Sequence, residues 1–112
     1  MKVSFEEIGR LSATFLAEEG EAGQVCRMTA NGKVAPCGDG EAFIGIMEGV
    51  RKGVSAVQLH GFAQVGYTGT APEVGYVNLA ANGNGGVKVS SGARAYLVVS
   101  VDTSAMTAII EL

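Results

Sequence analysis

Residues 43–67, FIGIMEGVRKGVSAVQLHGFAQVGY, constrain the fold more than any other part of the sequence. Two runs of residues that suit a pleated sheet are separated by Arg51-Lys52-Gly53, and a three-residue link containing glycine is typical of a β-hairpin. The second run alternates, which predicts a strand with one buried face. One face carries Val57, Leu59, Ala63, Val65 and Tyr67, and the other carries Gln58, His60, Phe62 and Gln64. This hairpin contains no recognisable catalytic or ligand-binding spacing.

Length and glycine content extend this prediction to the whole chain. The 112 residues suffice for one domain with one core, and 17 glycines with only two prolines indicate short strands joined by turns. We therefore expect an all-β protein, a small β-barrel or sandwich of short antiparallel strands and hairpins. Residues 11–112 would form this single β domain, and residues 1–10 an N-terminal arm.

Further strands are predicted on both sides of the central hairpin. Residues 12–16 read as a strand, residues 68–75 as a turn, and residues 107–112 as a strand that pairs back after a turn at 102–106. Residues 96–101, YLVVSV, form the longest apolar run, which predicts a central strand covered on both faces.

The sequence Asn31-Gly32 between two apolar segments is a strong signal for a two-residue type I′ hairpin turn. With that turn, Ala30 would oppose Lys33 and Cys26 would oppose Cys37. Reduced thiols are the preferred interpretation, because a directly hydrogen-bonded pair suits a disulfide poorly and a cytosolic origin disfavours it. A disulfide, or a metal or nucleophilic role for these cysteines, stays open as an alternative.

A weak repeat relates the two halves of the chain. Glu21-x-Gly23-x-Val25 recurs as Glu73-x-Gly75-x-Val77, Asn31-Gly32-x-Val34 as Asn84-Gly85-x-Val87, and Phe43-Ile44 as Tyr96-Leu97, with offsets of 52 and 53 residues (73 − 21 and 84 − 31). Chance turn chemistry is the competing explanation. If the repeat is real, it predicts two similar hairpin units that pack their apolar faces together.

Charge and hydropathy argue against several classes of partner. The net charge is −3 with scattered basic residues, whereas nucleic-acid binding needs clustered Lys and Arg. No apolar run approaches the ~20 residues that span a bilayer, so we expect no membrane partner and synthesis in a cytoplasm. The acidic run Glu18-Glu19-Gly20-Glu21 reads as a solvated turn, since a divalent cation needs more converging oxygens.

No catalytic arrangement can be recognised. His60 is the single histidine, and a surface or oligomer-interface role is the preferred interpretation. Ser90, Ser91 and Ser100 lack a nucleophile-elbow motif. Residues 82–86, NGNGG, resemble a phosphate loop but precede no helix, so a hairpin tip is expected. We therefore predict a protein that is not an enzyme, with no cofactor, catalytic residue or metal ligand.

The order of these features resembles the small β-rich capsid decoration (cement) proteins of tailed bacteriophages and prophages. The likeness spans residues 11–112. It rests on SATFLAEE, on the NGKV and FIGIM segments, on GFAQV with its central glycine, and on the C-terminal strands ARAYLVVSVD and TAIIEL. The N-terminal MKVSFEEIGRL lies outside the pattern.

The resemblance implies a non-enzymatic phage or prophage head decoration subunit on the capsid surface of a virion. Its partners would be the major capsid protein and further copies of itself in a homo-oligomer, with a trimer as one candidate state. The alternative is a small-ligand-binding β-barrel of bacterial origin, in which Tyr67, Tyr76, Phe62 and His60 line the mouth.

Overall fold

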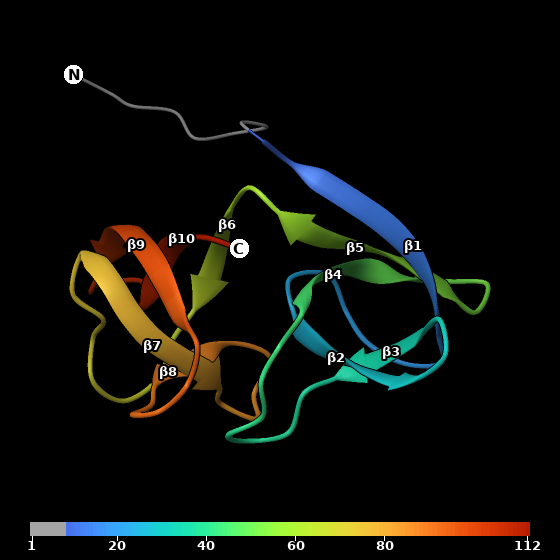
Figure 1. Ribbon diagram of the computed structural model, residues 1–112, viewed down its shortest axis with the longest axis horizontal. Coiled ribbons are helices and arrows are strands. Elements are labelled where there is room, and N and C mark those ends of the chain that lie inside the picture. Colours follow the sequence, from blue (N-terminus) through green and yellow to red (C-terminus); the bar gives the residue numbers. More distant parts are fainter. Residues whose placement is uncertain (1–8) are drawn as a thin grey trace.

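The computed structural model describes residues 9–112, and their regular structure consists of ten β-strands (Figure 1). The strands are β1 (Leu11–Ala17), β2 (Val25–Ala30), β3 (Lys33–Pro36), β4 (Gly45–Arg51), β5 (Val54–His60), β6 (Phe62–Gly66), β7 (Gly75–Ala81), β8 (Val87–Val89), β9 (Ala95–Asp102) and β10 (Thr107–Glu111). The expected all-β class is confirmed. Within the described residues no helix is long and apolar enough to cross a membrane. Most of the predicted arm, residues 1–8, lies outside the described residues.

The first five strands close into a barrel in the order β1-β3-β2-β4-β5. Four of the five neighbouring pairs are antiparallel, and the fifth, between β1 and β3, is parallel. In that parallel pair Leu16 lies opposite Lys33 and Ala17 opposite Val34. The β1–β3 contact therefore removes the free edges that an open five-stranded sheet would leave.

The last five strands repeat this arrangement in the order β6-β10-β9-β7-β8. Replacing each strand number n by n + 5 converts the pairings of the barrel into those of this sheet. Even the parallel closure has a counterpart, an isolated bridge between Tyr67 and Val87 at the ends of β6 and β8. The two predicted Asn-Gly tips lie at equivalent hairpins, β2–β3 and β7–β8. The chain thus contains two five-stranded units of one topology (Figure 1).

The junction between the two units is Gly61. We expected one continuous strand through residues 57–67, and this prediction is wrong, because β5 belongs to the first unit and β6 to the second. Gly61 has φ +97°, and a Cβ there would lie 2.8 Å from the Cα of Arg10. Only glycine combines that backbone conformation with so close a neighbouring chain.

The turn between β4 and β5 is one residue shorter than predicted. Arg51 still pairs with Val54, so the link consists of Lys52 and Gly53 alone. Both residues have positive φ, 54° and 77°, as a type I′ turn requires.

The register predicted around Asn31-Gly32 is also wrong beyond its first pair. Gly32 has φ +67°, but Asn31 is not among the described residues with positive φ, so the turn is not type I′. A bulge between Met28 and Ala30 shifts the pairing, and Cys26 faces Pro36 instead of Cys37. Because successive side chains alternate between faces, the shift sends the two cysteines to opposite sides of the hairpin.

Two apolar clusters fill the molecule. The smaller cluster fills the barrel of the first unit; its buried members are Ala17, Cys26, Val34, Met47 and Val57. The larger cluster lies inside the second unit and takes in Val25, Cys37, Phe43 and Ile46 from the first. The cysteines therefore belong to different clusters, and the two units share one of their cores.

Residues equated by the sequence repeat meet at the boundary between the units. Phe43 and Tyr96 stack with ring centroids 4.7 Å apart and planes inclined by 11°. The Tyr96 hydroxyl also donates a hydrogen bond to the Phe43 carbonyl at 3.3 Å. Burial of this phenol raises the pKa of Tyr96, although Arg94 acts in the opposite direction.

Backbone hydrogen bonds fasten the β7–β8 hairpin to the first unit. The Val25 amide donates to the Gly85 carbonyl at 3.0 Å, and the Ala81 amide donates to the Glu41 carbonyl at 2.9 Å. An ion pair between Lys88 and Asp39, 2.9 Å long, lies beside them. The predicted hairpin tip at residues 82–86 is confirmed, and it also forms part of the contact between the units.

Candidate functional site

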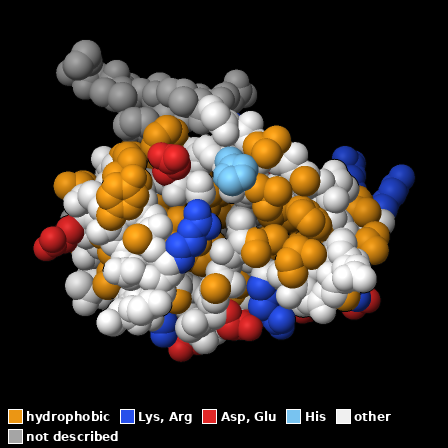
Figure 2. All heavy atoms as spheres, in the orientation of Figure 1, with side chains coloured by type: hydrophobic (Ala, Val, Ile, Leu, Met, Phe, Trp, Pro, Cys, Tyr) orange, Lys and Arg blue, Asp and Glu red, His pale blue; other side chains and the backbone are white. Residues whose placement is uncertain are grey.

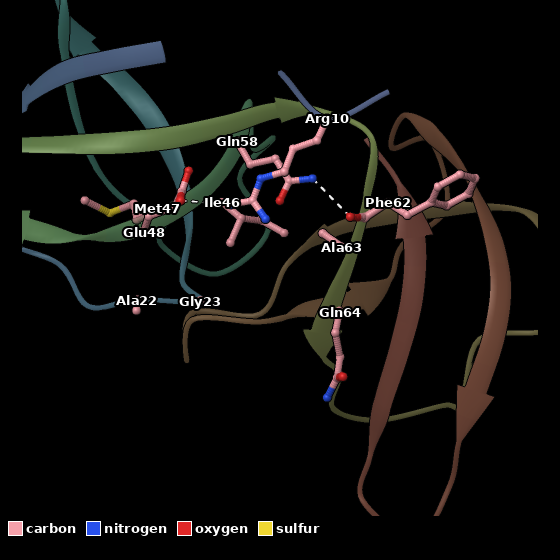
Figure 3. Close-up of a pocket in the computed structure, with 10 residues that line it drawn as sticks. All are labelled: Arg10, Ala22, Gly23, Ile46, Met47, Glu48, Gln58, Phe62, Ala63 and Gln64. Carbon is pink, nitrogen blue, oxygen red and sulfur yellow. Dashed lines mark hydrogen bonds and ion pairs between the residues drawn. The ribbon is translucent and has the colours of Figure 1, made fainter. Parts of the chain in front are cut away.

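A cleft of about 490 Å³ separates the two units beside the Gly61 junction (Figure 3). Its polar wall contains the guanidinium of Arg10, which pairs with the Glu48 carboxylate at 2.8 Å. The second carboxylate oxygen of Glu48 accepts a hydrogen bond from the Ser12 hydroxyl at 2.9 Å. Glu48 thus holds the chain segment that enters β1 against β4.

The buried amide of Gln58 holds the other side of this cleft. Its Nε2 donates to the Phe62 carbonyl at 3.0 Å (Figure 3) and to the His60 carbonyl at 3.1 Å. His60 and Phe62 are the two residues that flank Gly61. Gln58 therefore holds the bend between β5 and β6, while the Arg10–Glu48 pair holds the start of β1 against β4. Their geometry supports a structural role for the cleft.

The residues weighed for catalysis lie apart. His60 is exposed at the end of β5, where it pairs with Leu11 of β1. Ser90 and Ser91 follow β8, and Ser100 lies on the exposed side of β9. Within residues 9–112, no three His, Cys, Asp or Glu side chains gather as a metal site would require.

Both thiols are free and buried. Burial raises the pKa of Cys26 to about 12 and that of Cys37 to about 11. The sulfur of Cys26 donates to the Gly45 carbonyl at 3.6 Å, and that of Cys37 to the Ala42 carbonyl at 3.8 Å. A thiol that stays protonated at neutral pH is a poor nucleophile and a poor metal ligand.

The four residues predicted to line a ligand-binding mouth lie apart in the part of the chain that the structure describes. Tyr67 is buried in the larger cluster, and Phe62 borders the cleft between the units. Tyr76 borders a separate shallow groove beside β8, and His60 borders neither. The barrel itself is filled by side chains of the smaller cluster.

The outer face of the second unit exposes apolar side chains. Tyr76 of β7 is 77% exposed, and Val74 just before that strand is 69% exposed. The pairing of the strands sets Tyr76 beside Leu97, Leu97 beside Glu111, and Glu111 beside Phe62, in one row across β7, β9, β10 and β6. Glu73 lines the groove at one side of Tyr76. We call this surface the acidic face; it comprises Phe62, Glu73, Val74, Tyr76, Leu97 and Glu111.

The structure also corrects the prediction that β9, which carries Leu97 of the acidic face, is covered on both faces. That strand is central, between β10 and β7, as expected. It is not covered on both faces, because burial alternates along it: Tyr96 and Val98 are buried, whereas Leu97 is half-buried and Ser100 is exposed. A bulge in β9 opposite Ile109 and Ile110 adds one residue and shifts the alternation, so that Val101 and not Ser100 packs against the core.

A second exposed apolar group lies on the first unit, beside the β4–β5 turn. Leu16 of β1 is 55% exposed and pairs with Val54, which in turn pairs with Arg51. Lys52 follows in the turn and is also exposed. We call these four residues, Leu16, Arg51, Lys52 and Val54, the basic tip.

The acidic face and the basic tip lie at opposite ends of the molecule. The β4–β5 turn is at one end of the long axis and β7 and β9 are near the other (Figure 1). Figure 2 shows basic side chains projecting from the right-hand end, where this turn lies, and acidic side chains at the left-hand end. Sequence reasoning missed both surfaces, since each combines strands that are distant in the chain.

Comparisons with known proteins add no identification. A scan against protein-family models finds no match to this sequence, and a search of curated proteins finds none either.

Proposed function

We propose that this chain is a non-enzymatic structural subunit that binds and stabilises the capsid shell of a tailed phage or prophage. The proposal joins the resemblance described above to one observation, the exposed apolar surface around Tyr76. Contiguous exposed apolar groups with a polar rim are typical of surfaces that bind other proteins. The subunit would act on the capsid surface of the virion after synthesis in the bacterial cytoplasm.

The arrangement of the chain supports such a role. Two units of one topology share a core, and backbone hydrogen bonds join them, so each presents its outer surface on a firmly held support. A structural subunit of this kind needs no catalytic residues in its loops. Both of its cysteines are free thiols, so its stability does not depend on an oxidising compartment.

Binding to assembled shells tests the proposal directly. The purified chain would be mixed with shells of the major capsid protein encoded beside its gene and then centrifuged through a sucrose gradient. We expect the chain to sediment with the shells in a fixed ratio and to raise the temperature at which they disassemble. Shells from an unrelated phage serve as the control.

Two results would contradict this proposal. One is a chain that stays at the top of the gradient at every ratio tested. The other is a gene neighbourhood of metabolic enzymes together with a metabolite that raises the melting temperature of the chain. That second result would support the alternative, a small-ligand-binding β-barrel.

A further inference from the structure

We propose that the basic tip of one copy of this chain binds the acidic face of the next, so that the protein associates with itself head to tail. Each surface combines exposed apolar side chains with charges of one sign that make no ion pair among the described residues, and the Lys33–Glu18 pair beside Leu16 is neutral as a whole. Leu16 and Val54 adjoin Arg51 and Lys52, whereas Tyr76 and Leu97 adjoin Glu73 and Glu111. The two surfaces therefore match in both apolar character and charge.

The charges concerned are available for such a contact. The other described cations of the first unit are engaged within the chain: Arg10 with Glu48, Arg27 with Glu41, and Lys33 with Glu18. Of the ion pairs among residues 9–112, none involves Arg51, Lys52, Glu73 or Glu111. Both carboxylates and both cations are on exposed residues.

Charge also decides between the possible arrangements of two copies. Two acidic faces in contact would bring Glu73 and Glu111 against their own copies, and two basic tips would do the same with Arg51 and Lys52. Like charges placed together across an interface oppose binding. Contact between unlike surfaces leaves one tip and one face free at the ends, and such a chain of contacts closes into a ring or continues as a filament.

The dimensions of the molecule permit both contacts at once. The longest extent is 39 Å, and the two surfaces lie toward its opposite ends (Figure 1). A stable protein interface takes about 800 Å² from each partner, roughly one-eighth of the 6421 Å² accessible surface of this chain. One copy can therefore hold two neighbours and still leave most of its surface for another partner. The inference does not depend on the capsid proposal, because it concerns the purified chain alone.

Sedimentation velocity over a range of protein concentrations tests the inference. We expect the mass to rise above that of one chain as concentration increases, and the rise to weaken with added salt, because exposed charges are screened over about 8 Å at physiological ionic strength. A mass that remains that of one chain at every concentration would overturn the inference.

Charge reversal identifies the surfaces involved. One variant carries Arg51→Glu and Lys52→Glu, and another carries Glu73→Lys and Glu111→Lys. Each is expected to associate with itself at least about tenfold more weakly than the natural chain. Glu19→Lys is the matched control, because Glu19 is exposed, makes no ion pair among the described residues and lies on neither surface.

Mixing the two double variants distinguishes lost complementarity from damaged folding. In the mixture, the reversed tip of the first variant meets the reversed face of the second, and the natural tip of the second meets the natural face of the first. Association should therefore return in the mixture, with the two variants in equal amounts. If both variants associate as the natural chain does, or if the mixture fails to associate, the head-to-tail contact is wrong.

Discussion

Gly86→Ala is the sharpest test of how the second unit closes. An alanine Cβ at residue 86 would lie 2.3 Å from the carbonyl oxygen of Gly66 and 2.9 Å from its carbon. Both neighbours are backbone atoms, so no side chain can rotate away. The end of β6 would have to move by roughly 1 Å to reach an ordinary contact distance, and the Tyr67–Val87 bridge lies directly beside it.

The expected cost has two parts. Overpacking of this kind destabilises by roughly 1–3 kcal/mol. The same movement strains the hydrogen bond from the Asn82 amide to the Gly86 carbonyl, 3.1 Å, and that from the Thr68 amide to the Val87 carbonyl, 3.1 Å. At about 1 kcal/mol for each such bond, the total loss is about 3–5 kcal/mol. For a domain of this size, that corresponds to a melting temperature lower by about 10–20 °C.

Gly92→Ala is the matched control. Gly92 has φ +85°, and a Cβ there would meet no heavy atom within 4 Å. Its cost is therefore limited to the left-handed backbone conformation, about 1–2 kcal/mol. Urea unfolding followed by circular dichroism measures both free energies of unfolding. The reasoning fails if Gly86→Ala loses no more stability than Gly92→Ala.

Further predictions concern the buried side chains. The native protein should react slowly with a thiol reagent at pH 8, because Cys26 and Cys37 are buried and their pKa values are raised to about 12 and about 11. After unfolding without reductant, two free thiols should titrate, because neither cysteine is in a disulfide. Fast labelling of the native protein, or fewer than two thiols after unfolding, would contradict this prediction. The raised pKa values of Cys26, Cys37 and Tyr96 favour the neutral forms in the folded state. The free energy of unfolding should therefore be constant between about pH 7 and pH 8 and fall from there toward pH 12, as urea titrations at several pH values would measure; a rise toward pH 12 would contradict the assignment. Met47→Ala should lower the free energy of unfolding by about 2–5 kcal/mol, because this side chain is 1% exposed in the barrel core. Met106→Ala, at a residue that is 43% exposed, should lower it little in the same urea assay. Equal losses of stability in the two variants would refute the placement of the core.

Local turn chemistry accounts for most of what the sequence predicts correctly. The Asn-Gly tips, the glycine between β4 and β5, the alternation in β5 and the location of β10 depend on neighbouring residues, so they can be read along the chain. The internal repeat likewise follows from local order and predicts two similar units. Their all-β class needs no further information.

The errors arise where distant segments decide the structure. The bulge near Thr29 moves Cys37 to the opposite face, although the turn residues alone allow the simpler register. The break at Gly61 depends on Arg10, fifty-one positions earlier (61 − 10), which crosses that glycine. The parallel contact between β1 and β3 joins residues without any local signature. The acidic face and the basic tip depend on the same non-local pairings.

The two units differ in the number of residue pairs that close each of them, β1 with β3 in the first and β6 with β8 in the second. In the first, the amides of Leu16 and Ala17 donate to the carbonyls of Gly32 and Gly53 at 2.8 and 3.0 Å, and two residue pairs join β1 to β3. In the second, the amides of Tyr67 and Thr68 likewise donate to the carbonyls of Met106 and Val87 at 3.0 and 3.1 Å, but only one residue pair, Tyr67 with Val87, makes the equivalent closure. Amide protons near Tyr67 should therefore exchange with solvent water sooner than those near Leu16. Local opening of the backbone would then begin in the second unit, which carries the acidic face. That surface could adjust its shape to a partner while the barrel of the first unit stays closed.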